Sequence, residues 1–248
     1  MNLNVRNNIR IKIVFLISAI VFVFSAVNLI YIIYDSYNNK KLNNELSENI
    51  SQISEKSIKD SSNKDIMDNL SNINDDIKGS IKIKNTKINY PIVQNKDNQF
   101  YINHNAKKNQ SKYGSIFIDC RNKLDDNFLG QNIILYGHNM RDGSMFADLQ
   151  KFRNKKFFNT STIDLEVFPK KYKFKVFSII LVNSDFNYRK IFFDNDQEIQ
   201  QYLKRIKSLA LYFKDIKLNH KDTIITLSTC SYDWKNSRIV VLGKLIKY

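Results

Sequence analysis

Thr223-Ile224-Ile225-Thr226-Leu227-Ser228-Thr229-Cys230 is followed by a polar loop, Ser231 to Ser237, and then by Arg238-Ile239-Val240-Val241-Leu242. The two β-branched runs predict two strands that pair as a hairpin through the loop. Cys230 closes the first strand and Arg238 opens the second, so their side chains are expected to face each other across the mouth of the hairpin. The sequence thus predicts a thiol and a fixed cation side by side at the end of a sheet.

A third strand is predicted at Asn132-Ile133-Ile134-Leu135-Tyr136, and Gly137 and His138 follow it. Gly137 is expected to give the backbone the freedom to aim His138. A side chain at a strand end can be held rigidly while its tip stays exposed, which suits a catalytic group. We therefore treat Cys230, His138 and Arg238 as one candidate catalytic site.

The chemistry of such a site needs three different residue types. A thiol with a reference pKa of about 8.5 is only roughly 3% thiolate at pH 7, so a nucleophilic cysteine needs a cationic neighbour. His138 can supply that charge and later protonate a leaving amine. Arg238 is always charged, and its fork of donors suits the oxyanion that forms when a thiolate attacks an acyl carbon.

The same residues also have a structural interpretation. Cys120 and Cys230 are the only two cysteines, and an oxidising compartment could join them as one disulfide. A single histidine near a strand end is more often a packing or surface residue, and one arginine among 39 basic residues carries little weight alone. A non-enzymatic surface module with a Cys120–Cys230 bridge therefore stays open beside catalysis.

Short strand patterns dominate the sequence from Gly79 onward, and their number predicts a mainly β fold that closes into a barrel. The further strands are expected at residues 88–93, 115–119, 163–168 and 172–182. One helical insert is expected after Asp142-Gly143-Ser144, and a second near Asn195 with Glu198 three residues on. Residues 79–248 are expected to form a single domain around one core.

The amino-terminal end predicts a membrane anchor. Residues 13–34 contain no charged side chain and are long enough to cross the hydrocarbon layer as one helix. Basic residues precede this span, which places the tail of residues 1–12 in the cytoplasm and the remainder outside the cell. Cleavage near Ser25-Ala26 is the alternative.

The segment of residues 35–78 predicts two helices. Apolar residues recur at helical spacing in two stripes, with Ser61-Ser62-Asn63 as the break between them. The first stripe is Leu42, Leu46, Ile50 and Ile53, and the second is Ile66, Leu70, Ile73 and Ile77. A helical stalk and a mostly solvated spacer both fit this pattern.

Four stretches together resemble a class B sortase, a membrane-anchored cysteine transpeptidase of Gram-positive bacteria. They are residues 226–230 with the spacing to Arg238, residues 136–140 followed by Met145-Phe146, residues 85–94 and residues 114–119. The resemblance extends from about Gly79 to Tyr248 and implies a sortase-type β-barrel with amino-terminal helices. Cys120 departs from the family pattern, in which another residue is more usual at that position.

The resemblance implies a function as well as a fold. Cys230 would attack a threonine carbonyl in a sorting motif near the carboxyl end of a secreted protein, and a peptidoglycan amine would resolve the thioacyl enzyme. His138 would act as general acid and base, and Arg238 would hold the oxyanion. Ser228 and Tyr188 would support the bound peptide, although Tyr188 could equally be an ordinary loop aromatic. An extracellular cysteine endopeptidase would use the same residues with water as the acceptor.

The net charge of +15 invites a nucleic-acid partner, but the predicted membrane span argues against one. Outside a cell the charge favours contact with an anionic envelope. The sequence shows no phosphate-binding glycine loop and no paired metal-ligand spacing, so no cofactor and no metal are expected.

Overall fold

The computed structural model describes residues 3–57, 70–124 and 129–247. The chain divides into two compact units, Met1–Leu42 and Asn43–Tyr248. One continuous helix, α1 (Leu3–Ser57), begins in the first unit and ends in the second. The part of α1 within Arg10–Gln52 includes a stretch that is long and apolar enough to cross a membrane.

The amino-terminal helices differ in part from the prediction. In the second unit Leu46 and Ile50 of α1 are buried, which confirms this part of the first apolar stripe. The side chain of Ile53 and all of residues 58–69, including Ile66 and the expected break, lie outside the described residues. Ile77 is not helical, because it pairs with Val93 as the first residue of a strand whose side chains alternate in burial with a period of two.

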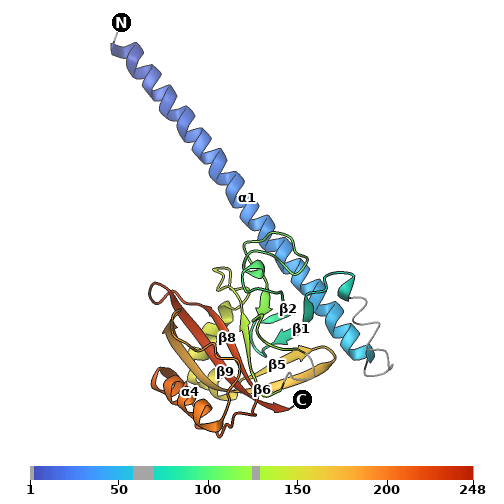
Figure 1. Ribbon diagram of the computed structural model, residues 1–248. Coiled ribbons are helices and arrows are strands. Elements are labelled where there is room, and N and C mark those ends of the chain that lie inside the picture. Colours follow the sequence, from blue (N-terminus) through green and yellow to red (C-terminus); the bar gives the residue numbers. More distant parts are fainter. Residues whose placement is uncertain (1–2, 58–69, 125–128, 248) are drawn as a thin grey trace. The chain divides into compact units, whose positions relative to one another are not determined.

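The second unit is built on a closed β-barrel (Figure 1). In its described residues the sheet has nine strands in the order β5-β1-β2-β3-β4-β8-β9-β6-β7, and an additional β5–β6 pairing closes eight of them into a ring that leaves β7 attached at one edge. The pairs β2–β3 and β4–β8 are parallel, whereas the other pairs are antiparallel. The strands are β1 (Ile77–Lys82), β2 (Asn89–Val93), β3 (Ile116–Ile118), β4 (Asn132–Tyr136), β5 (Thr162–Val167), β6 (Lys170–Asn183), β7 (Ala210–Phe213), β8 (Ile224–Cys230) and β9 (Ser237–Lys247).

Two apolar clusters lie on the two faces of this sheet. The larger cluster fills the barrel and includes Ile225, Leu227, Ile239 and Val241. Because successive strand residues point to opposite faces, their neighbours Val240 and Leu242 belong to the second cluster, outside the barrel. Helix α4 (Asp196–Ser208) covers that outer cluster with Ile199, Tyr202, Leu203 and Ile206. This helix is the predicted one, and Asn195 caps it by accepting a hydrogen bond from the Glu198 N–H at 3.0 Å.

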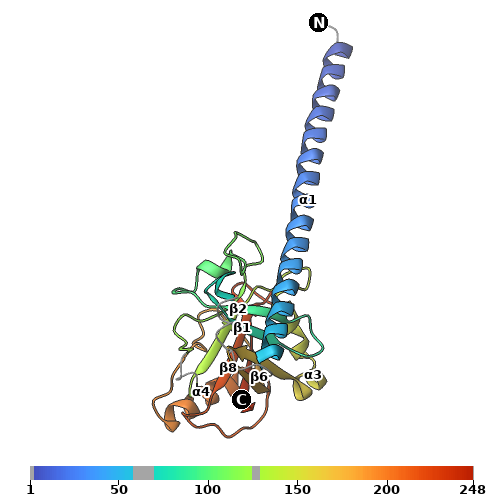
Figure 2. The ribbon, with the colours of Figure 1, turned by 90° about the vertical axis from the view of Figure 1, so that its right-hand side faces the viewer.

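The first helical insert is a 3-10 helix rather than an α-helix. Phe146, Leu149 and Phe152 are buried as predicted, but their spacing of three residues matches the three residues per turn of η2 (Ala147–Arg153). Asp142 caps only a turn, where it accepts hydrogen bonds from the backbone and hydroxyl of Ser144. A short helix, α3 (Lys155–Thr160), follows, and Figure 2 shows α3 and α4 on different sides of the sheet.

Strands β1 and β7 are absent from the sequence-based prediction. Gly79, which was placed at a domain boundary, lies inside β1, where an added Cβ would sit 1.8 Å from the Glu166 carbonyl oxygen of β5. The glycine therefore permits a close approach of two strands rather than marking a break. Strand β7 is short and partly exposed, and it lacks the burial alternation that identifies a strand.

Candidate functional site

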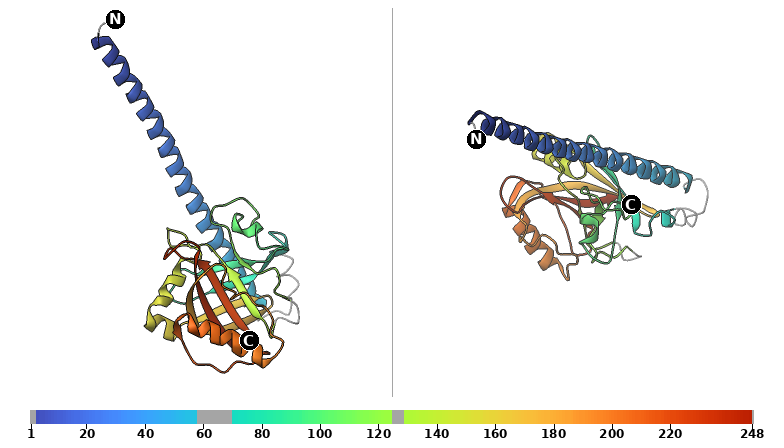
Figure 3. Two further views of the ribbon diagram at one scale, coloured as in Figure 1. Left: turned by 60° about the vertical axis from the view of Figure 1, so that its left-hand side comes forward. Right: turned by 90° about the horizontal axis from the view of Figure 1, so that it is seen from above.

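The β8–β9 hairpin has the predicted register. Cys230 is paired directly with Arg238, and the two strands run side by side (Figure 3). Directly paired residues of antiparallel strands point to the same face, so the thiol and the guanidinium group share the outer face of the barrel end. Strand β4 lies on the other side of β8 and is parallel to it, with Tyr136 paired to Ser228. The residues after Tyr136 therefore leave the sheet at the same end as Cys230.

Four hydrogen bonds join the His138 segment to the Cys230 segment. The Gly137 N–H donates to the Ser228 carbonyl oxygen at 3.3 Å, and the Thr229 hydroxyl donates to the Gly137 carbonyl oxygen at 2.6 Å. The Asn139 side-chain amide donates to the Cys230 carbonyl oxygen at 2.9 Å, and the Tyr232 hydroxyl donates to the Asn139 carbonyl oxygen at 2.7 Å. These bonds fix the two segments relative to each other on both sides of His138.

Gly137 is required for a reason other than the predicted one. Its φ is not among the positive values in the chain, so no special backbone freedom is used. A Cβ at this position would instead lie 2.3 Å from Cδ1 of Ile116 and 2.9 Å from the ring of Phe146. Gly137 thus lets the His138 segment pass directly over two buried side chains.

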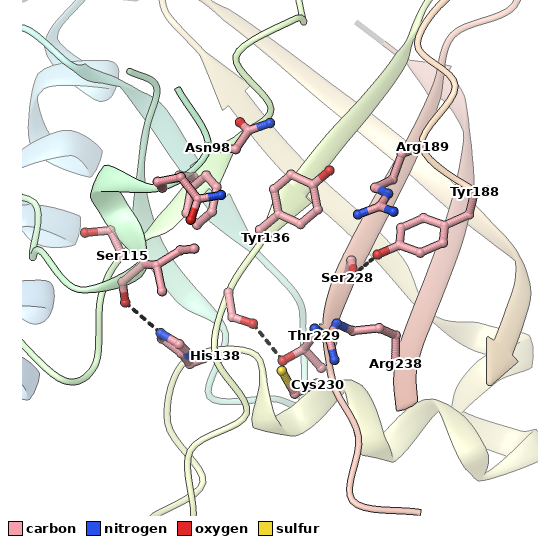
Figure 4. Close-up of a pocket in the computed structure, with 14 residues that line it drawn as sticks. Asn98, Ser115, Tyr136, His138, Tyr188, Arg189, Ser228, Thr229, Cys230 and Arg238 are labelled. Atoms are coloured by element: carbon pink, nitrogen blue, oxygen red, sulfur yellow. Dashed lines mark hydrogen bonds between the residues drawn. The ribbon is translucent and has the colours of Figure 1, made fainter. Parts of the chain in front are cut away.

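All five predicted site residues line one pocket of about 460 Å³ (Figure 4). The thiol of Cys230 lies between His138 and Arg238, while Ser228 and Tyr188 lie farther along the pocket. The other lining residues are Asn98, Gln99, Ile102, Ser115, Phe117, Tyr136, Gly137, Arg189 and Thr229. The structure therefore brings together five predicted site residues that are separated by up to 100 positions in the sequence.

The imidazole of His138 is held by a backbone carbonyl group. Its Nε2 lies 2.7 Å from the Ile102 carbonyl oxygen, on the side of the ring away from the thiol in Figure 4. A carbonyl oxygen can only accept a hydrogen bond, so Nε2 must carry a proton. In the neutral ring, Nδ1 is then the nitrogen that can accept a proton from a substrate.

The guanidinium group of Arg238 is half-buried at the mouth of the hairpin. One of its N–H groups donates to the Ser237 carbonyl oxygen at 3.1 Å. This hydrogen bond orients the guanidinium group without neutralising its charge. The remaining N–H donors of the guanidinium group suit a developing oxyanion.

Ser228 and Tyr188 support each other. Their hydroxyl groups lie 2.8 Å apart, and both residues are buried. The backbone of Tyr188 is fixed in turn, because its carbonyl oxygen accepts a hydrogen bond from the Tyr202 hydroxyl at 3.0 Å. Tyr188 thus belongs to the outer apolar cluster under α4 and is not a plain loop aromatic.

The loop between Cys230 and Arg238 is tied to the end of η2, which the sequence analysis did not anticipate. Asp233 pairs with the guanidinium group of Arg153 and accepts a hydrogen bond from the Ser231 hydroxyl. These hydrogen bonds, that of Arg153 first, lower the pKa of Asp233 to about 2. A carboxylate and an arginine 80 residues apart offer no local signal by which sequence reasoning could have paired them.

A second unanticipated group lies under the pocket. Asp119 is fully buried, and it accepts hydrogen bonds from Arg121 and, at 2.8 Å, from the Tyr136 hydroxyl. Burial raises the pKa of Asp119, but the hydrogen bonds from Arg121 and Tyr136 outweigh it, so the net pKa is lowered. Arg121 also donates to the Arg189 carbonyl oxygen at 3.1 Å. Asp119 and Arg121 therefore hold two lining residues, Tyr136 and Arg189, in place.

The alternative of a Cys120–Cys230 disulfide is wrong, because both thiols are free. The sheet register explains why. Ile118 of β3 pairs with Leu135 of β4, and Leu135 pairs with Leu227 of β8. Two residues beyond Ile118, Cys120 therefore lies opposite Ile133 of β4 and, two strands away, Ile225 of β8. Ile225 is five residues before Cys230 along β8. This corresponds to about 16 Å along the strands and about 10 Å across them, whereas a disulfide requires Cα atoms within about 7 Å. Burial, followed by the charge of Asp119, raises the pKa of the Cys120 thiol, which makes it a poor nucleophile.

Comparisons with known proteins agree with this geometry. Residues 81–246 match the sortase domain family. Sortase B of Listeria monocytogenes is 40% identical over 186 residues, which are 74% of this chain and 75% of that protein. The X-ray structure of Clostridium perfringens sortase B has 43% identity and a TM-score of 0.67, over 73% of this chain and 99% of that one. A Staphylococcus aureus sortase B–substrate complex has 33% identity and a TM-score of 0.76, over 86% of this chain and 98% of that one. The chain therefore belongs to the sortase family, and within it to the class B sortases.

Proposed function

We propose that this sortase-type cysteine transpeptidase cleaves a sorting motif near the carboxyl end of secreted proteins and joins the new carboxyl end to a peptidoglycan amine. The observation that supports this proposal is the arrangement of Cys230, His138 and Arg238 around one pocket of about 460 Å³. The pocket is large enough for several residues of an extended peptide, and it presents a nucleophile, an acid and a cation to one carbonyl group.

The proposed reaction has two steps that exchange one acyl bond for another. The Cys230 thiolate attacks the peptide carbonyl carbon, and Arg238 stabilises the oxyanion that forms. His138 protonates the departing amine, so the C–N bond breaks and a thioester remains. An incoming amine then attacks the thioester carbon, gives a proton to His138 and releases the thiolate, and a new amide bond completes the transfer.

Ser228 and Tyr188 are proposed to support the bound peptide. Their hydroxyl groups bond to each other, so the pair forms a fixed wall of the pocket beside Cys230. Because this wall is ordered before the peptide arrives, less freedom is lost on binding. Tyr188 is held from behind by Tyr202 of α4, so the helix contributes to the shape of the pocket.

The proposed location follows from α1. Residues 13–34 would anchor the enzyme by one membrane span, with residues 1–12 in the cytoplasm because of the basic residues that precede the span. The barrel, whose first strand β1 begins at Ile77, would act outside the cell, where secreted proteins and peptidoglycan are both accessible.

The proposal is tested with the full-length protein in detergent micelles. The protein is incubated with a library of peptides and with candidate amines, and the products are followed by mass spectrometry. We expect a mass increase on Cys230 for some peptides and an amide product when amine is added. Release of acid alone, with every amine, would favour the endopeptidase alternative, and the absence of any acyl adduct would contradict both enzymatic functions.

A further inference from the structure

A second hollow of about 540 Å³ borders the catalytic hairpin. It is lined by residues of β6, of the segment that follows β6 and of the loop between Cys230 and Arg238, and by Leu209 at the end of α4. It shares no lining residue with the catalytic pocket. We call it the Trp234 pocket. Its lining includes Val182, Asn183, Asp185, Asn187, Leu209 and Trp234.

The sheet register places the Trp234 pocket close to the thiol. Cys230 is paired with Arg238, and Arg238 is paired on its other side with Val182. The three residues therefore form one row across β8, β9 and β6. Two strand spacings separate Cys230 from Val182, which is about 10 Å. A molecule bound in the Trp234 pocket could thus reach the thioester on Cys230 by passing over Arg238.

The lining combines an aromatic surface with polar groups. Trp234 is 46% exposed, and its indole N–H donates to the Asn183 side-chain oxygen at 2.6 Å, so the ring is fixed although one face is open. Leu209 is also exposed, at 45%. An exposed tryptophan and an exposed leucine that line the same hollow provide apolar surface suited to the aliphatic part of a ligand.

Asp185 gives this pocket its charge preference. Within the described residues its carboxylate makes no ion pair and no side-chain hydrogen bond, in a chain whose net charge is +15. Asn187 likewise has no side-chain hydrogen bond to the part of the chain that the structure describes. An exposed carboxylate without a cationic partner, next to an apolar surface, is complementary to a ligand that carries ammonium or N–H groups on aliphatic chains.

A transpeptidase must hold a second substrate while the first occupies the catalytic pocket. We propose that the Trp234 pocket binds this acceptor, and that the acceptor is a peptide with more than one amino group. One amine attacks the thioester, and a second ammonium group binds Asp185 while the aliphatic stem lies on Trp234. This inference rests on the proposed transfer to an amine.

The test compares two nucleophiles on the same acyl-enzyme. The full-length protein in micelles is acylated with a sorting peptide, and either a lysine-containing tripeptide or hydroxylamine is added. Hydroxylamine is too small to span both sites. We expect Asp185→Asn to lower the ratio of tripeptide transfer to hydroxylaminolysis about fivefold at low salt, as loss of an exposed ion pair can do, and less at high salt. Asp185→Lys should lower the ratio further.

Asp194→Asn is the matched control, because Asp194 is an exposed aspartate of the segment that precedes α4 and lies outside both pockets. It should leave the ratio unchanged. An unchanged ratio in Asp185→Asn, with normal acyl-enzyme formation, would refute the Trp234 pocket as the acceptor site. If the wild-type protein forms no acyl-enzyme, the proposed function itself fails, and this outcome is distinguished by the missing adduct on Cys230.

Discussion

Gly137→Ala should damage the active site without touching a catalytic group. The added Cβ would lie 2.3 Å from Cδ1 of Ile116 and 2.9 Å from the Phe146 ring, and both side chains are buried. Carbon atoms in contact normally lie about 3.5–4.0 Å apart, so the chain at residue 137 or the two buried side chains must shift by about 1 Å or more. Overpacking of this kind destabilises a fold by about 1–3 kcal/mol.

The same shift should reduce catalysis. His138 follows directly after Gly137, and the hydrogen bonds of Gly137 to Ser228 and Thr229 would be strained. A displacement of 1 Å in a catalytic group can reduce the rate about a hundredfold. We therefore expect the acylation rate of Cys230, measured in single turnovers, to fall by about that factor.

A double-mutant cycle separates the clash from other effects. Ile116→Val removes the Cδ1 atom that lies nearest to the added Cβ, and on its own it should cost about 0.5–1.5 kcal/mol. Combined with Gly137→Ala it should restore part of the stability and of the acylation rate. Denaturation can be followed by the fluorescence of Trp234, the single tryptophan of the chain. Additive effects in the double variant, or near-normal acylation by Gly137→Ala, would refute the steric argument.

Four further substitutions have defined outcomes. Cys230→Ala should abolish acyl-enzyme formation in a folded protein, whereas Cys120→Ser should retain most activity, and loss of activity in the latter would show that Cys120 has a role we have missed. Arg238→Lys keeps the charge but loses the planar fork, so it should raise the acylation barrier by on the order of 3 kcal/mol, or about a hundredfold in rate; near-normal single-turnover acylation would exclude the oxyanion role. Because Arg153 and Ser231 lower the folded-state pKa of Asp233 to about 2, from an ordinary 3.8, this carboxylate stabilises the fold above about pH 4, and that stability is lost as the pH falls toward about 2. Asp233→Asn should therefore flatten the pH dependence of the denaturation midpoint in that window, and an unchanged slope would show that the ion pair adds no stability.

The three candidate catalytic residues could be placed together from the sequence because each lies at the end of a strong local pattern. The β-branched runs of β8 and β9 fixed the pairing of Cys230 with Arg238 through a short loop. The position of His138 at the end of β4 could also be read locally. The parallel pairing of β4 with β8 could not be read locally, because the order of strands in a barrel is decided by packing of the whole sheet.

The supporting residues were missed because their signals are tertiary. Arg153 and Asp233 are ordinary surface residue types until the fold places them together. Asp119 lies in a predicted strand, but only the structure shows that Arg121 and Tyr136 satisfy its buried charge. Gly79 was taken as a boundary because strand patterns were recognised only from that residue onward, whereas its close contact with Glu166 lies within β1.

Cys230 and Arg238 share one face of the sheet because they are directly paired and because side chains alternate between the two faces along each strand. Ile239, one residue beyond Arg238, already belongs to the barrel interior. One residue inserted within β8 or β9 would therefore turn the thiol or the guanidinium group into the apolar core. Residues inserted between Ser231 and Asn236 would leave that alternation intact, and surface loops tolerate such insertions at little entropic cost. The length of this loop can thus change while Cys230 and Arg238 keep their positions on the outer face of the barrel.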